Sequence, residues 1–187
     1  MTLVEQAIVF AINAHHGMKR KMENVPYILH PLEVVTIAGT MTDNESILAA
    51  AALHDTVEDS DTKLEDIEKT FGHRVRELVE CETENKRQNL PPEETWYIRK
   101  KESLDNLEKS NDIGFKMLWL SDKLANMRSL HRLWRREGNA MWKGFNQDDP
   151  SRQAWYYRTV GEIVSDLRDY DAWKEYQYLV DIVFEGV

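Results

Sequence analysis

An unbroken apolar run at residues 47–53 constrains the fold of this chain more than any other feature, because charged residues follow it directly. A helix that is apolar on every side has to be buried in a protein core. The next residues include His54, Asp55, Glu58 and Asp59. If the helix continues, these four side chains fall within an arc of roughly 140° and point into one region of space. The run therefore predicts a buried helix that ends in a polar cluster.

Such a cluster needs electrostatic compensation. Burying an isolated charge costs several kcal/mol unless the charge is paired or coordinated, and a divalent cation would satisfy several carboxylates at once. The alternative is a helix that reaches solvent after Leu53, with hydrated acids and with His54 bonded to a neighbour. That alternative suits most acidic clusters, since charged residues are usually exposed. Here the apolar run and two further segments favour a metal site.

The two further segments offer additional metal ligands. His30 follows Tyr27 in the sequence PYILHP and lies where a loop meets a predicted helix, so its imidazole can reach a site formed elsewhere. Asp122 and Asn126 lie one turn apart on a face of an otherwise apolar helix. Taken alone, this pair is more typical of a polar stripe on an amphipathic helix. The segments gain weight only in combination with the first cluster.

Together, the three segments supply two imidazoles and two carboxylates as candidate metal ligands: His30, His54, Asp55 and Asp122. Mixed imidazole and carboxylate ligation suits Mn²⁺, Fe²⁺ or Zn²⁺. Four protein ligands on an octahedral metal leave positions for water and a substrate oxygen, which is the arrangement that activates water and polarises a phosphoryl group. Glu58 and Asp59 then remain as candidate catalytic residues that orient the attacking water and move protons.

Apolar spacing elsewhere in the chain is helical, and no segment shows the sustained alternation of a strand. Helices are predicted at about 3–15, after His30-Pro31, and at 63–70, 73–81, 93–109, 112–135, 151–168 and 171–184. Thr42 and Thr62 are expected to open helices as the first residues of capping boxes. Residues 84–95, which contain Pro91-Pro92, are expected to form a loop. The predicted fold class is all-α.

Composition narrows the class of protein. A chain of 187 residues with 42% hydrophobic and 30% charged residues is expected to form one domain. Cys81 is the only cysteine, no apolar run is long enough to span a membrane, and the N-terminus lacks a signal-peptide pattern, so we expect a cytoplasmic protein. The net charge of −9 argues against nucleic-acid binding. A small anionic substrate remains compatible, given the basic residues 19–21.

The ordered set of His30, His54-Asp55 and Asp122 reproduces the H…HD…D signature of the HD superfamily. Neighbouring segments that narrow the resemblance are FA at 10–11, HHG at 15–17, RK at 20–21, PYILHP at 26–31, HDTVED at 54–59, FG at 71–72 and DKLANMR at 122–128. Over about residues 5–168, the chain resembles the hydrolase domain of the RelA/SpoT family of alarmone hydrolases. This implies a single HD-domain helical bundle over residues 1–187, with a C-terminal helical extension at 169–187, and a small stand-alone enzyme.

The resemblance also implies an activity and a cofactor. The family reaction is the Mn²⁺-dependent hydrolysis of the 3′-pyrophosphate of ppGpp or pppGpp, which yields GDP or GTP and pyrophosphate. The Glu58-Asp59 pair is characteristic of active hydrolases in that family. Two alternatives stay open: an HD enzyme that acts on another nucleotide, such as an adenosine alarmone, and a non-catalytic nucleotide-binding regulator. The intact acidic pair argues against the regulator, because a binding protein has no evident need for both acids.

Substrate contacts follow from the same resemblance. The matching residues are Arg20 and Lys21 near the base and phosphates, Asn126 at the ribose or base, Tyr156 beside the ribose, and Lys100 or Lys101 at the distal phosphates. Guanidinium stacking and cationic phosphate contacts suit these roles, although an exposed basic loop is an equal alternative for residues 20 and 21. Met18 and Ala125 depart from the residues that relatives often carry, and residues 129–149 match no family segment. The preferred purine, the preferred phosphate number and a homo-oligomeric state stay open.

Overall fold

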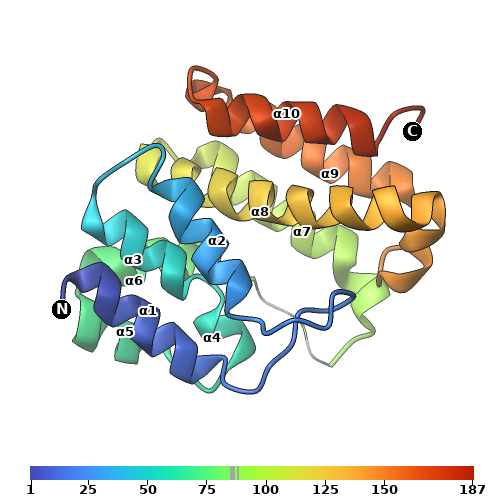
Figure 1. Ribbon diagram of the computed structural model, residues 1–187. Helices are drawn as coiled ribbons and strands as arrows, with labels where there is room; N and C mark the ends of the chain where they lie inside the picture. Colours follow the sequence, from blue (N-terminus) through green and yellow to red (C-terminus); the bar gives the residue numbers. More distant parts are fainter. Residues whose placement is uncertain (85–86, 88) are drawn as a thin grey trace. The chain divides into compact units, whose positions relative to one another are not determined.

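Helices form the regular secondary structure of the protein, seen in a computed structural model that describes residues 1–84, 87 and 89–187 (Figure 1). Within these ranges, extended pairing is limited to an isolated bridge between Lys19 and Pro26. The all-α prediction is confirmed. The same part of the chain contains no helix with the length and apolar character that a membrane span requires.

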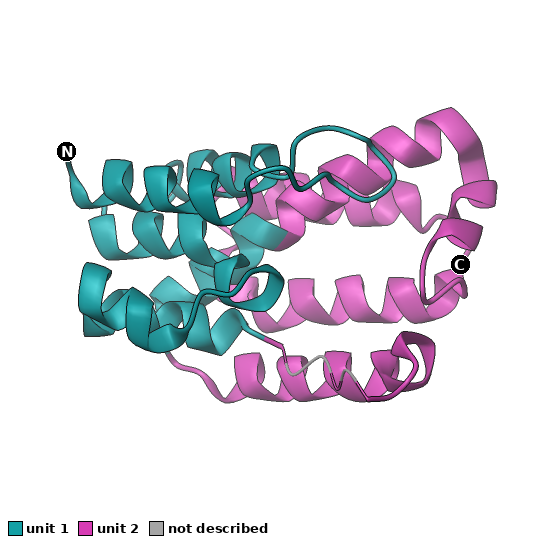
Figure 2. Cartoon of the chain, turned by 90° about the horizontal axis from the view of Figure 1, so that it is seen from below, with its two compact units in different colours: residues 1–83, 112–122 teal, residues 84–111, 123–187 magenta. Residues whose placement is uncertain are grey.

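The chain divides into two compact units, drawn in different colours in Figure 2. Unit 1 comprises residues 1–83 and 112–122, and unit 2 comprises residues 84–111 and 123–187. The long helix α8, Ile113–Glu137, contributes its first part to unit 1 and the rest to unit 2. The expected domain boundaries, one domain over 1–187 with a core at about 5–168, stay a prediction.

Unit 1 is built around the apolar helix that the sequence indicates. Its helices are α1 Leu3–Ala14, α2 Leu29–Ala38, α3 Glu45–Leu53, α4 Thr56–Asp59, α5 Leu64–Phe71 and α6 His73–Glu82. Helix α3 packs against α1, α2 and α6, and residues 49–53 are at most 1% exposed. Burial on all sides explains why this helix is apolar around its whole circumference.

The start of α8 approaches α3 closely within unit 1. Asp112 accepts hydrogen bonds from the backbone N–H of Gly114 at 2.9 Å and forms an ion pair with Arg74 of α6 at 2.6 Å. A Cβ atom at Gly114 would lie 2.9 Å from Cδ1 of Ile47 in α3, so a larger residue would require the end of the Ile47 side chain to shift. These contacts fix the start of the helix that carries Asp122.

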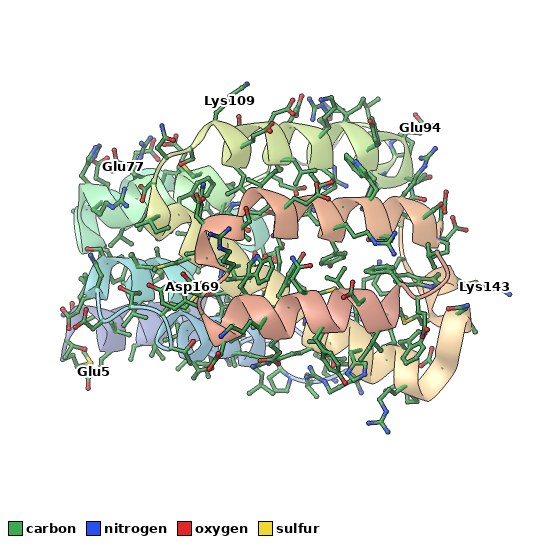
Figure 3. The ribbon with its side chains drawn as sticks, turned by 90° about the horizontal axis from the view of Figure 1, so that it is seen from above. Glu5, Glu77, Glu94, Lys109, Lys143 and Asp169 are labelled. Atoms are coloured by element: carbon green, nitrogen blue, oxygen red, sulfur yellow. The ribbon has the colours of Figure 1, made fainter. Side chains whose placement is uncertain are left out.

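Unit 2 contains α7 Pro92–Lys109, the rest of α8, the 3₁₀ helix η1 Gly138–Gly144, α9 Pro150–Ile163, the 3₁₀ turn η2 Ser165–Leu167 and α10 Asp171–Val183. Helix α9 packs against both α7 and α10. Figure 3 shows the charged side chains of Glu94 and Lys109 on the side of α7 that faces away from α9. Residues 129–149, which the motifs of the sequence left unplaced, form the second half of α8, η1 and the turn that follows.

Two helix starts and one loop differ from the predictions. Helix α3 is capped by Asn44, which accepts from the Ser46 N–H at 2.9 Å, and Thr42 instead accepts from the Asn44 N–H at 3.2 Å. At α5, Asp66 accepts from the backbone N–H of Lys63 at 3.1 Å, one residue later than a box opened by Thr62 would require. Helix α3 begins later than expected because Asn44 satisfies a free N–H group of its first turn. Helix α5 begins at Leu64, after Lys63, whose backbone N–H bonds to Asp66.

The predicted loop at 84–95 extends too far at its C-terminal end, because a helix begins before residue 95. Helix α7 begins at Pro92, a residue suited to the first helical position because it has no N–H to leave unpaired. Residues 92–95 are therefore helical. Residues 85, 86 and 88 of the predicted loop lie outside the described residues.

Candidate metal centre and substrate residues

The four candidate ligands meet within unit 1. His30 Nε2 lies 3.0 Å from Asp122 Oδ1 and 3.5 Å from Asp55 Oδ2. His54 Nε2 lies 3.0 Å from Asp55 Oδ2 and 3.6 Å from Asp122 Oδ1. Residues from α2, α8 and the end of α3 thus bring two imidazole nitrogens and two carboxylate oxygens close together.

The environment of His54 fits a metal ligand. Its Nδ1 lies 2.9 Å from the carbonyl oxygen of Ala51, which can only accept, so Nδ1 carries a proton and Nε2 is the nitrogen left to face a cation. The residue is 1% exposed, and Nε2 faces the Asp55 and Asp122 oxygens without forming a hydrogen bond of regular geometry within the described part of the chain. A buried polar atom without a regular hydrogen bond is costly, and a divalent cation would supply the partner. His30, His54 and Asp122 form a buried group whose ligand atoms lie within 4.8 Å of one another.

Electrostatics couple the imidazoles and carboxylates strongly. Burial lowers the pKa of His54, but the negative charges of Asp55 and Asp122 outweigh burial and raise this pKa well above its usual value. Burial opposes ionisation of Asp55, yet the neighbouring imidazoles of His54 and His30 hold its pKa well below its usual range. Burial also lowers the pKa of His30, against the attraction of Asp122. The pocket therefore favours positive charge between the two carboxylates, which a bound cation provides.

The candidate catalytic acids lie on a separate short helix. Helix α3 ends at Leu53, and α4 begins at Thr56, so the single continuous helix assumed from the sequence is wrong. The hydroxyl of Thr56 donates to the carbonyl oxygen of Leu53 at 2.6 Å and stabilises the turn. Glu58 and Asp59 are partly exposed on α4, and the charge of Asp59 acts on the buried His15 and the partly buried Tyr27.

Tyr27 and His15 belong to the site and were not singled out individually from the sequence. The Tyr27 hydroxyl donates to Asp55 Oδ2 at 2.7 Å. Burial and the charges of Asp55 and Asp59 raise the Tyr27 pKa, so the hydroxyl stays a donor. His15 is 3% exposed, and neither of its ring nitrogens has a hydrogen-bond partner among the described residues. A usable signal for His15 is its spacing of four residues from Ala11 on the buried face of α1.

A short hairpin carries the basic residues. The Arg20 N–H donates to the Val25 carbonyl at 2.8 Å, and the Tyr27 N–H donates to the Met18 carbonyl at 2.9 Å. This pairing places the Arg20 guanidinium 5.8 Å from the centre of the Tyr27 ring. Lys21, next to it in the hairpin, is exposed.

The other predicted substrate residues lie in unit 2. Lys100 Nζ is 4.9 Å from the centre of the buried Tyr156 ring and 2.6 Å from Glu84 Oε1. Lys101 instead lies 3.4 Å from Asp105 and lines a pocket of about 460 Å³ beside Trp155. The structure thus pairs Tyr156 with Lys100 and not with Lys101.

Two further residues that bear on the predicted substrate site lie on α8. Asn126 follows Asp122 by one helical turn and is partly exposed. Ala125, a departure from the residues of the family, is fully buried and offers the site no polar group. The position of the unit 2 residues relative to the metal centre stays a prediction.

This helical fold and the converging imidazoles and carboxylates are the features of an HD-domain protein. Residues 7–146 match the HD domain family, and the chain belongs to that family. It is 41% identical over 131 residues to mouse guanosine-3′,5′-bis(diphosphate) 3′-pyrophosphohydrolase MESH1, covering 68% of this chain and 69% of the relative. The Xenopus tropicalis protein of the same name is 36% identical over 170 residues, covering 89% and 85%.

A solved structure extends the similarity over nearly the whole chain. It is described as "A metazoan ortholog of SpoT hydrolyzes ppGpp and plays a role in starvation responses". The TM-score is 0.70 at 29% sequence identity, covering 98% of this chain and 94% of the other. The resemblance to alarmone hydrolases is confirmed.

Proposed function

We propose that this protein is a Mn²⁺-dependent hydrolase that removes the 3′-pyrophosphate from ppGpp and pppGpp. The observation that carries the proposal is the meeting of two imidazoles and two carboxylates around the buried His54 Nε2. Membership of the HD family and the named activity of its MESH1 relatives support the same reaction. The absence of a cysteine pair from the sequence is consistent with a cytoplasmic setting.

His30, His54, Asp55 and Asp122 would hold the cation. A divalent ion bound there lowers the pKa of a water molecule and polarises a phosphoryl oxygen. In the reaction, the water oxygen bonds to the phosphorus that is attached to the ribose 3′ oxygen. The bond between this phosphorus and the 3′ oxygen breaks. The water loses its protons, the 3′ oxygen gains one, and Glu58 and Asp59 on α4 accept and deliver these protons.

The substrate residues have complementary roles in the proposal. Arg20 stacks on the purine, and the ring of Tyr27, whose centre lies 5.8 Å from the guanidinium carbon, holds Arg20 in place by a cation–π contact. Lys21 and Lys100 bind phosphates, Tyr156 packs beside the ribose, and Asn126 contacts the ribose or base. Between the two lysines left open by the sequence, the contact with Tyr156 favours Lys100, whereas Lys101 faces Asp105.

A panel of nucleotides and metals tests this function. The metal-free protein is incubated with ppGpp, pppGpp or ppApp, each with Mn²⁺, Zn²⁺, Mg²⁺ or no ion, and pyrophosphate release is measured. The proposal expects the fastest release from guanosine alarmones with Mn²⁺ and none without a metal. Faster release from ppApp would assign an adenosine alarmone as the substrate. Nucleotide binding without release under every condition would assign a non-catalytic regulator and overturn the proposal.

A further inference from the structure

Tyr27 occupies a place that neither the metal ligands nor the acidic pair explains. Its hydroxyl donates to Oδ2 of Asp55, the same oxygen that lies 3.0 Å from His54 Nε2 and 3.5 Å from His30 Nε2. The hydrogen bond therefore reaches the carboxylate oxygen that faces the imidazoles. An oxygen of a carboxylate has two lone-pair directions, so this bond uses one and leaves the other for a cation.

The Tyr27 ring is itself held in place on several sides. Its backbone N–H donates to the Met18 carbonyl across the hairpin, and its carbonyl accepts from the His30 N–H at 2.9 Å. The buried ring of His15 lies 4.9 Å away, centre to centre, at an angle of 42°. Arg20 lies on the ring at 5.8 Å. A side chain fixed in this way can hold Asp55 in one orientation before any ion arrives.

We propose that Tyr27 is a positioning residue that aims the Asp55 carboxylate at the metal, with His15 as the buried wall that fixes the Tyr27 ring. Asp55 lies in the turn between α3 and α4, so the helices alone do not determine its side-chain direction. A hydrogen bond that orients a ligand from behind commonly contributes 10–100-fold to metal affinity. The inference concerns the metal site and holds whichever nucleotide is the substrate.

The position of Tyr27 also connects the two halves of the proposed reaction site. Its hydroxyl contacts a metal ligand, whereas its ring supports Arg20, to which the proposed function assigns purine stacking. Loss of the hydroxyl alone should therefore affect metal binding and spare nucleotide capture. Loss of the ring should affect both.

The test measures the affinity for Mn²⁺ alone. The protein is titrated with Mn²⁺, and the unbound ion is followed by electron paramagnetic resonance; circular dichroism verifies folding. Tyr27→Phe keeps the ring and should weaken Mn²⁺ binding about 10–100-fold. Tyr178→Phe removes the hydroxyl of a 62% exposed tyrosine on α10 and should leave the affinity unchanged. An unchanged Mn²⁺ affinity in a folded Tyr27→Phe protein would overturn the inference.

A second pair of variants tests the wall and remains informative if Tyr27→Phe does not fold. His15→Ala removes the ring beside Tyr27 and should weaken Mn²⁺ binding, whereas His15→Phe keeps an aromatic wall and should restore it towards the wild-type affinity. Equal affinities for the two His15 variants would contradict the role of His15. At saturating Mn²⁺, Tyr27→Phe should also leave KM for ppGpp near the wild-type value; a raised KM with unchanged metal affinity would assign the hydroxyl to the substrate. Because the titrations need no nucleotide, they stay valid if the proposed activity is not found.

Discussion

At the scale of single residues, the candidate metal ligands and the candidate proton carriers lie on different elements. The candidate ligands converge around His54 Nε2, whereas Glu58 and Asp59 lie on the short helix α4 beyond the helix break. A carboxylate can hold an ion or move a proton, but the two roles respond differently to neutral replacements. Removing a ligand lowers metal content, whereas removing a proton carrier slows the reaction of a fully loaded enzyme.

The acidic pair gives the first prediction. Glu58→Gln and Asp59→Asn should each keep the metal and lose roughly 10²–10⁴-fold in kcat, since each replacement preserves shape and removes an acid that carries protons. Elemental analysis of the purified variants and steady-state kinetics measure the two quantities. A variant that loses its metal would show that the residue is a ligand, and the division of roles would be wrong.

The basic hairpin gives the second prediction. The protein carries a net charge of −9, so an anionic nucleotide needs local positive charge to approach the carboxylates. Arg20→Ala and Lys21→Ala should raise KM far more than they lower kcat, the pattern expected when binding common to ground and transition states is lost. The Lys21 effect should shrink at high salt, because its side chain is exposed and its charge is screened. Kinetics at two salt concentrations measure both effects. Unchanged KM values would show that the hairpin is a surface turn with no role in substrate binding.

At the scale of elements, the residue that caps α3 has a measurable effect on stability. Asn44 accepts from the Ser46 N–H, so Asn44→Ala should lower the free energy of unfolding by about 1 kcal/mol. Thr42→Ala is the matched comparison, since it removes only the exposed hydrogen bond from the Asn44 N–H outside the helix; it should lower stability by less than Asn44→Ala does. Urea denaturation compares the two, and a larger effect of Thr42→Ala would restore the capping box predicted from the sequence.

The helices, and the candidate ligands that the structure brings together, were predictable because strong local signals encode them. Apolar periodicity over a dozen residues places α1, α7 and α10 within one residue of their observed ends. Helix starts were less predictable because neighbouring Thr, Asn and Asp side chains compete for the same N–H groups. The break after Leu53 was missed because helical spacing continues through it in the sequence.

Tyr27 and His15 were missed for a different reason. The Tyr27 contact joins residues 28 positions apart, and no local pattern encodes it. Sequence motifs identified the residues that would carry the chemistry. The residues that orient them became visible only when the hairpin, α1 and the turn after α3 were brought together in unit 1.

At the scale of the whole molecule, the metal site should couple function to stability. Its residues come from α2, the α3–α4 turn and α8, so a bound ion joins segments that are distant in sequence. Ligand that binds the folded state alone stabilises it by about 2.7 kcal/mol at a concentration 100 times the Kd. Removing the metal with a chelator should therefore lower the Tm, and adding Mn²⁺ should restore it. Differential scanning calorimetry measures the change in Tm. His54→Ala is the control, because adding Mn²⁺ should leave the Tm of this variant unchanged.

The central claim is that this metal centre releases pyrophosphate as one unit from the ribose 3′ position. Phosphorus NMR of ppGpp, incubated with metal-free protein and then with added Mn²⁺, tests it most directly. We expect no change before Mn²⁺ is added, then equal amounts of GDP and inorganic pyrophosphate, with no reaction for His54→Ala. Release of orthophosphate in place of pyrophosphate, or full turnover without any divalent ion, would contradict it.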